Sequence, residues 1–292
     1  MTARAVPLPP PRWHPGALSP ASGAAAFLVA LRLGALVAPL VAPYTADALD
    51  LANRRAAPSV AHWFGTDELG RDVLTRVLLG ARVSLAIGLL SALASAGIGV
   101  LVGSMAGYAG RWLDDLLMRG TDAMLAVPRL PLLMLAVPRL PLLMLAAAIV
   151  QPGVPLLIVL VACTGWMETA RVVRAEVQSL SACDYVQAAR AVGAPWWRVL
   201  LRHLLPGVIP TASVATTLAI GRGILLESTM SYFGVGVQPP TASWGNMLYQ
   251  AQTTMSTEPW LAIFPGLCIF ATVLACNAVG DTLGRPLSRT AS

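Results

Sequence analysis

Long apolar segments recur along this chain of 292 residues, and they constrain its fold more than any other feature. A helix needs about 20 mainly apolar residues to cross the hydrocarbon core of a membrane. Segments that meet this requirement fall at roughly 22–43, 85–108, within 119–151, 153–169, 207–230 and 260–282. Charged residues make up 12% of the chain, against about 25% in a soluble domain. We therefore predict an all-α polytopic membrane protein with about six transmembrane helices.

The arginines predict the orientation of these spans, because basic residues near span ends are enriched on the cytoplasmic side. With the N-terminus inside, the internal segments hold Arg4, Arg12, Arg111, Arg119, Arg171, Arg174, Arg190, Arg198, Arg202, Arg285 and Arg289. The external segments hold Arg54, Arg55, Arg71, Arg76 and Arg82. We expect both termini to be cytoplasmic. Residues 1–21 would be a mobile Pro-rich tail, 22–283 the transmembrane domain and 284–292 a second cytoplasmic tail.

The absence of lysine excludes several kinds of chemistry. All 20 basic residues are arginine, whereas a Walker A phosphate loop and Schiff-base catalysis both need a lysine. If ATP drives this protein, partner subunits bind it, and we expect no catalytic residue and no cofactor in this chain. The net charge of +6 lies mostly in loops, which indicates membrane orientation and not nucleic-acid binding. The four cysteines lack the spacing of a zinc site, so we expect no metal site.

The segment 185–206, YVQAARAVGAPWWRVLLRHLLP, is polar and helical in character and lies between two apolar runs. It resembles the "EAA" loop of ABC-importer permeases, the cytoplasmic element that docks on the partner ATPase. One letter departs, because Gln187 stands where the family has glutamate. The resemblance implies a coupling loop (185–206) with the functional positions Gln187, Ala188, Ala189, Gly193, His203 and Pro206. We expect two short helices joined near Gly193, since glycine tolerates a positive φ. The alternative is an amphipathic cytoplasmic helix without a partner.

Two further motifs narrow the resemblance to permeases for dipeptides, oligopeptides and nickel. They are FGTDELGRDVLTRVLLGARVSL, from Phe64 to Leu85, and ESTMSYFGVGVQPPTASWGNML, from Glu227 to Leu248. Read without the resemblance, the first predicts an outer loop that leads an amphipathic helix into the second span. Gly65 and Gly70 would permit turns, and Asp67 or Asp72 would cap the helix.

The resemblance implies one permease subunit of a bacterial ABC importer in the cytoplasmic (inner) membrane. Its partners would be a second permease subunit, ATP-binding subunits, an extracytoplasmic solute-binding protein and membrane lipid. The expected substrate is a di- or oligopeptide. The alternatives are nickel or another small solute, a non-ABC secondary transporter, and a membrane scaffold without transport. None of the three histidines lies in a predicted span.

Charged residues inside the predicted spans are candidates for the transport path. Such a residue costs several kcal/mol unless it faces protein or water. Arg32 lies in the first span, whereas Arg222 and Glu227 lie in the fifth, about 140° apart around the helix. The fifth span also carries hydroxyl groups, and the pore or gate candidates are Thr216, Thr217, Arg222 and Glu227. For Arg222 the alternative is snorkelling or pairing with a neighbouring helix.

The decamer LAVPRLPLLM occurs twice in tandem, at 125–134 and 135–144. A continuous helix from Arg119 to Gly153 would be about 52 Å long, whereas the hydrocarbon core is about 30 Å thick. We expect the first copy to extend into the cytoplasm and the second to begin the third span near Pro138 or Pro141. Deleting 125–134 should then leave assembly intact or improve it.

Overall fold

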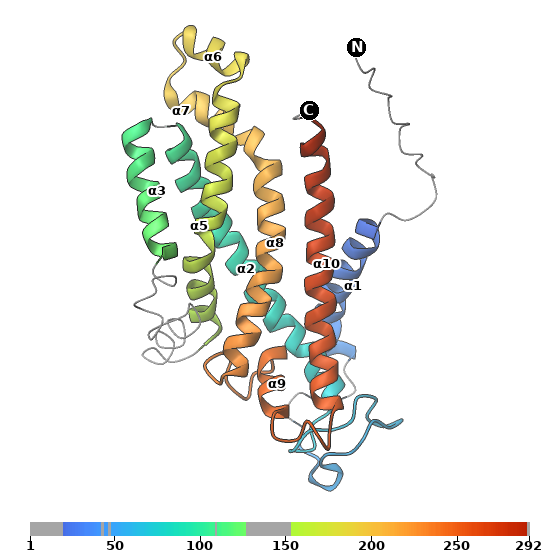
Figure 1. The fold of residues 1–292 in the computed structure, drawn as a ribbon. Coiled ribbons are helices and arrows are strands. Elements are labelled where there is room, and N and C mark those ends of the chain that lie inside the picture. Colours follow the sequence, from blue (N-terminus) through green and yellow to red (C-terminus); the bar gives the residue numbers. More distant parts are fainter. Residues whose placement is uncertain (1–19, 42–43, 46–47, 109, 127–152, 291–292) are drawn as a thin grey trace, which may run out of the picture.

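The computed structural model describes residues 20–41, 44–45, 48–108, 110–126 and 153–290. Their regular structure is helical, apart from one isolated β-bridge between Thr66 and Asp72. The long helices pack into a bundle (Figure 1) and are α1 (Pro20–Val41), α2 (Val73–Tyr108), α5 (Val154–Ser181), α8 (Leu205–Tyr232) and α10 (Trp260–Thr290).

Shorter helices occupy the two ends of the bundle (Figure 1). The coupling end, at the top of the figure, consists of α6 (Asp184–Ala191), α7 (Trp196–Val199) and the π-helical turn η4 (Leu200–Leu204). The capped end, at the bottom, consists of residues 48–72 with η1 (Leu51–Asn53) and residues 234–251 with α9 (Trp244–Ala251). The C-terminal end of α10 lies at the coupling end.

The helical membrane fold is confirmed. Among the described residues, four segments are long and apolar enough to cross a membrane: Val73–Tyr108, Val154–Ser181, Trp196–Tyr232 and Trp260–Gly284. Helix α1 contains a shorter apolar stretch, Gly23–Gly34. The placement of both termini in the cytoplasm stays a prediction.

Several helices are longer than the sequence predicts. Helix α2 begins at Val73 and not at 85, so the predicted amphipathic helix and the second span are one helix. Helix α5 ends at Ser181 and not at 169, and α10 continues to Thr290, past the expected boundary at 283. Hydropathy falls where charged residues begin, but backbone hydrogen bonding continues through them, because it does not depend on side-chain polarity.

Part of the predicted third span is described as α3 (Arg111–Ala126). The remainder of that span, and the duplicated decamer beyond Ala126, lie outside the described residues. The prediction for the two copies therefore stays a prediction. Residues 1–19 of the expected N-terminal tail also lie outside the described residues.

Close packing between α2 and α5 depends on glycines of α2. A Cβ atom on Gly103 would lie 2.4 Å from the carbonyl oxygen of Ala170 and 2.9 Å from the Cβ of Val173. Gly99 and Gly107 approach α5 in the same way. Small residues let helices come together in lipid, where no hydrophobic force drives their association. The glycines therefore decide which face of α2 meets α5.

Helix α3 is joined to α5 by charged side chains. Arg174 of α5 contacts the carboxylate of Asp114 through Nε at 2.5 Å and Nη2 at 2.6 Å. Gln178 donates to the same carboxylate at 3.2 Å. A second pair joins Arg171 to Asp122. These contacts fix α3 beside the half of α5 that leads to the coupling end.

Candidate functional site

The coupling loop (185–206) forms two short helices joined by a turn, as the sequence predicts. Gly193 has a φ of 84°, a left-handed conformation that costs a residue with a side chain about 1–2 kcal/mol. Its N–H donates to the carbonyl of Arg190 at 2.9 Å, and the N–H of Ala194 donates to that of Ala189 at 3.1 Å. These bonds close the end of α6, and glycine lets the chain turn back toward the bundle.

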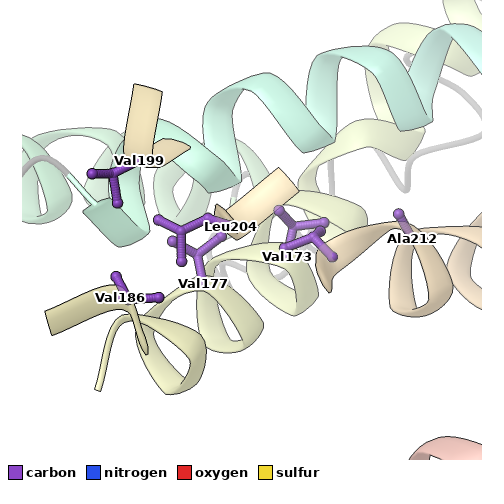
Figure 2. Packing of buried hydrophobic residues seen from close by; sticks show 7 residues of the cluster. Val173, Val177, Val186, Val199, Leu204 and Ala212 are labelled. Carbon is purple, nitrogen blue, oxygen red and sulfur yellow. The ribbon is translucent and has the colours of Figure 1, made fainter. Parts of the chain in front are cut away.

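One face of the coupling loop is anchored to the bundle by apolar side chains (Figure 2). Val186 of α6, Val199 of α7 and Leu204 of η4 are fully buried. The same cluster contains residues of α5 and α8, namely Val173, Val177, Val208 and Ala212. The guanidinium of Arg190 also lies over the ring of Tyr108, 4.6 Å from its centroid, at the end of α2. The loop is therefore packed directly on the long helices.

The opposite face of the coupling loop is exposed. Gln187 and Ala188 are exposed and Ala189 is half-buried. The amide of Gln187 donates to the carbonyl of Ala182 at 3.1 Å, so it makes a polar contact within this chain. Five large apolar side chains of the loop are also exposed: Tyr185, Val192, Trp196, Trp197 and Leu201. Gln187 and Ala188 are therefore accessible to a partner.

His203 and Pro206 lie where the coupling loop joins α8. The ring of His203 is half-buried, with its centroid 6.4 Å from that of Tyr185. Pro206 lies in the first turn of α8, where a proline is tolerated. Just before it, the N–H of Leu205 donates to the carbonyl of Leu200, which is the i→i−5 bond of a π turn. The functional roles of His203 and Pro206 stay predictions.

A cavity of about 280 Å³ lies between α2, α5 and α8. Arg222 of α8 lines it and forms an ion pair with Glu168 of α5, which also lines it. The two side chains are 53% and 45% exposed, so both are open to the cavity side of the bundle. The pairing with a neighbouring helix that the sequence left open for Arg222 is thus what the structure shows. Its role in a pore stays a prediction.

Residues 99–291, which include the coupling loop and the cavity helices α5 and α8, match the family described as binding-protein-dependent transport system inner membrane component. The chain belongs to this family. It is a multi-pass permease subunit of an ABC importer in the bacterial inner membrane. This identification agrees with the resemblance carried by the three sequence motifs.

Named relatives cover most of the permease. It is 38% identical over 259 residues to a provisionally named peptide permease protein of Brucella suis biovar 1 (strain 1330), covering 88% of this chain and 82% of the relative. It is 40% identical over 261 residues to the glutathione transport system permease protein GsiD of Escherichia coli O6:K15:H31 (strain 536 / UPEC). This match covers 89% of this chain and 83% of the relative. GsiD of Shigella boydii serotype 4 (strain Sb227) gives the same values.

Glu227 of the permease is fully buried among serines near the capped end. Ser84 of α2 donates to its Oε2 at 3.0 Å, and Ser231 donates to its Oε1 at 2.8 Å. The same two hydroxyls accept the backbone N–H groups of Trp244 at 3.2 Å and Val237 at 3.1 Å. Glu227 therefore connects α2, α8 and α9 through hydrogen bonds. It does not line the cavity, and its role as a gate stays a prediction.

Thr216 and Thr217 satisfy their hydroxyls within α8. They donate to the carbonyls of Ala212 at 2.7 Å and Ser213 at 2.9 Å. Neither side chain lines the cavity that contains Arg222. Thr217 instead lies beside Gly280 of α10. Their assignment to the pore stays a prediction.

Buried ion pairs stabilise the capped end of the permease. Asp67 accepts a bond from Nε of Arg71 at 2.7 Å and lies 3.7 Å from Nε of Arg76. Nη2 of both arginines points to Oε1 of Gln250, at 3.5 and 3.4 Å. Asp67, Arg71 and Arg76 are at most 6% exposed. The network therefore joins the start of α2 to α9 inside the protein.

The predicted helix cap and turns of this region are confirmed. Asp72 caps α2 by accepting the N–H and hydroxyl of Thr75, both at 2.8 Å, and it also contacts Nδ1 of His62 at 3.0 Å. Gly65 and Gly70 have φ of 76° and 77°. A Cβ atom on Gly70 would lie 1.9 Å from the carbonyl oxygen of Asp50, so only glycine fits there.

Glu168 is not among the site residues predicted from the sequence. The predicted fourth span ends at 169, which places this acid at a membrane boundary. Because α5 continues to Ser181, Glu168 instead lies in the middle of the helix. The signal was present in the sequence, since an arginine at membrane depth needs an acidic partner on a neighbouring span. Arg32 of α1 is exposed on the bundle surface.

Proposed function

We propose that this permease moves di- or oligopeptides across the inner membrane. Its partners would be a second permease subunit, ATP-binding subunits and an extracytoplasmic solute-binding protein. The substrate class is supported by the relatives, which are named for peptide and glutathione transport, and glutathione is a tripeptide. The lack of lysine supports ATP binding by the partners, with no cofactor and no catalytic step in this chain.

The two-sided coupling loop is the observation that carries the proposal. Its buried face packs on α5 and α8 through Val186, Val199 and Leu204. Its exposed face offers Gln187 and Ala188 to an ATP-binding subunit. Closely packed interiors transmit displacement, so movement of the ATPase would shift the helices that wall the cavity. Peptide would then pass between the two permeases by alternating access.

Ala188→Leu tests the docking of the ATPase. Because Ala188 is exposed, a larger side chain should leave the fold of the permease intact but block close approach of the partner. In proteoliposomes that contain the complete transporter, we expect peptide uptake per ATP hydrolysed to fall at least tenfold. Gly193→Leu should have the same effect, because leucine disfavours the φ of 84°.

Ala123→Leu is the matched control, since Ala123 is exposed on α3 and away from the coupling loop. It should leave uptake and ATP hydrolysis unchanged. Unchanged uptake and ATPase stimulation in Ala188→Leu would overturn the docking. A wild-type transporter that hydrolyses ATP with its binding protein but takes up no peptide would overturn the substrate class.

A further inference from the structure

The Arg222–Glu168 pair is not explained by the packing of the helices that carry it. Helices α5 and α8 already meet through an apolar cluster that includes Val173, Val177 and Val208. An ion pair as exposed as this one contributes little to holding two helices together. A charge at membrane depth is instead, by default, a sign of a functional site. Both partners also keep about half of their side-chain surface open.

We propose that the cavity between α2, α5 and α8 is a transit subsite for a zwitterionic substrate. Arg222 binds the carboxylate of the substrate, and Glu168 binds its ammonium group. This inference rests on the proposed function, because the free termini of a peptide supply these two groups.

Charge balance is the physical basis of the subsite. The planar guanidinium of Arg222 can form two parallel hydrogen bonds to a carboxylate. Arg222 and Glu168 pair with each other and are the two charged residues among the described residues that line the cavity, so their charges balance. A zwitterion replaces one ion pair by two and leaves every charge paired. A solute with only one charged end would leave Glu168 or Arg222 unpaired at membrane depth, which is costly.

The cavity wall suits the end of a peptide. Ser91 and Ser95 belong to the cavity wall, but both are buried and donate their hydroxyl hydrogens to backbone carbonyls at 3.2 and 3.1 Å, so Arg222 and Glu168 carry the polar recognition. Gly165 lets α5 pack closely on α2 at this wall, because a Cβ atom there would lie 2.7 Å from Oγ of Ser95. The volume of about 280 Å³ is near the lower limit for small-molecule sites. The cavity therefore recognises terminal groups and small residues rather than one long side chain.

Blocked peptides test the subsite. The probes are alanyl-alanine, its N-acetyl derivative and its C-terminal amide, taken up by the complete transporter in proteoliposomes with saturating binding protein. We expect Arg222→Gln to reduce the preference for a free carboxylate over the amide at least tenfold, and to leave the preference for a free amino group. Glu168→Gln should reduce the preference for a free amino group over the N-acetyl derivative at least tenfold, and leave the preference for a free carboxylate. The binding protein is the same in every variant, so a change in these ratios arises in the permease.

Arg171→Gln is the matched control, because Arg171 also forms an interhelical ion pair, with Asp122, and the two are 49% and 59% exposed. It lies outside the cavity and should leave both ratios unchanged. Arg222→Lys keeps the charge but loses the planar fork. It should raise KM for the free peptide and not for the amide. If Arg222→Gln does not assemble, Arg222→Lys tests the carboxylate contact in its place.

If Arg222→Gln and Glu168→Gln reduced the uptake of all three probes equally, the subsite would be overturned. The pair would then only join the two helices. A wild-type transporter that takes up the three probes equally well would also overturn it, with the proposed function intact. Absence of any peptide uptake by the wild type would instead overturn the proposed function, and the subsite with it.

Discussion

The two ends of this permease are stabilised by different interactions. At the coupling end, Val186, Val199 and Leu204 pack on the bundle, and Arg190 lies over the ring of Tyr108. At the capped end, buried ion pairs and hydrogen bonds centre on three acids, Asp67, Asp72 and Glu227. Both ends pack on the same long helices. The two kinds of contact therefore differ in how firmly they hold those helices in place.

Apolar contacts are non-directional, so an element that they anchor can tilt without breaking a specific bond. Buried charged groups have one satisfied geometry, and separating them leaves a charge or a donor unpaired. The coupling end is therefore suited to transmit a displacement, whereas the capped end keeps α2, α8 and α9 in one arrangement. Four experiments test this contrast.

Asp67→Ala should have the largest effect. Arg71 and Arg76 would stay buried without the carboxylate they contact, and breaking such a buried pair costs roughly 3–5 kcal/mol. The measurement is the thermal unfolding midpoint of the transporter purified in detergent. Glu68→Ala, which removes the adjacent exposed acid, should change it little. Equal effects of the two substitutions would mean that the network does not stabilise the capped end.

Gly70→Ala should rank second. The left-handed φ of 77° costs alanine about 1–2 kcal/mol. The added Cβ would also lie 1.9 Å from the carbonyl oxygen of Asp50, so the backbone must shift. We expect a total loss above about 2 kcal/mol in the same unfolding assay. A loss no larger than the φ cost would show that this end adapts easily.

Gly193→Ala should cost less than Gly70→Ala, although both glycines have a similar φ. At Gly193 a Cβ atom would meet nothing within 4 Å, so only the φ of 84° opposes alanine. The expected loss is about 1–2 kcal/mol. The difference between the two glycine variants measures how much more tightly the capped end is packed, and a difference near zero would contradict the contrast.

Removal of the contact between Arg190 and Tyr108 should have the smallest effect. Arg190 is exposed, and a cation–π contact at an exposed site contributes about 0.5–1 kcal/mol. A double-mutant cycle with Arg190→Gln and Tyr108→Leu isolates this interaction energy. A coupling energy of several kcal/mol would show that the coupling end, too, depends on a specific polar contact.

Features with near neighbours in the sequence were predictable. The cap of Asp72 on Thr75, the turns at Gly65 and Gly70, and the bend at Gly193 each depend on residues within a few positions. The ends of the helices were not predicted well, because hydropathy marks where apolar residues stop and not where backbone hydrogen bonding stops. The error in α5 concealed the position of Glu168.

The sequence by itself determined the membrane class, the four spans within α2, α5, α8 and α10, and the two helices of the coupling loop. Hydropathy and local backbone preferences are sufficient for these features. Only the tertiary structure decided that Arg222 meets Glu168 and that Ser84 reaches Glu227, 143 residues away. Such pairs depend on the rotation and depth of each helix, which follow from close packing at residues such as Gly103. A hydropathy window averages over all faces of a helix, so it contains no information on which face meets which neighbour.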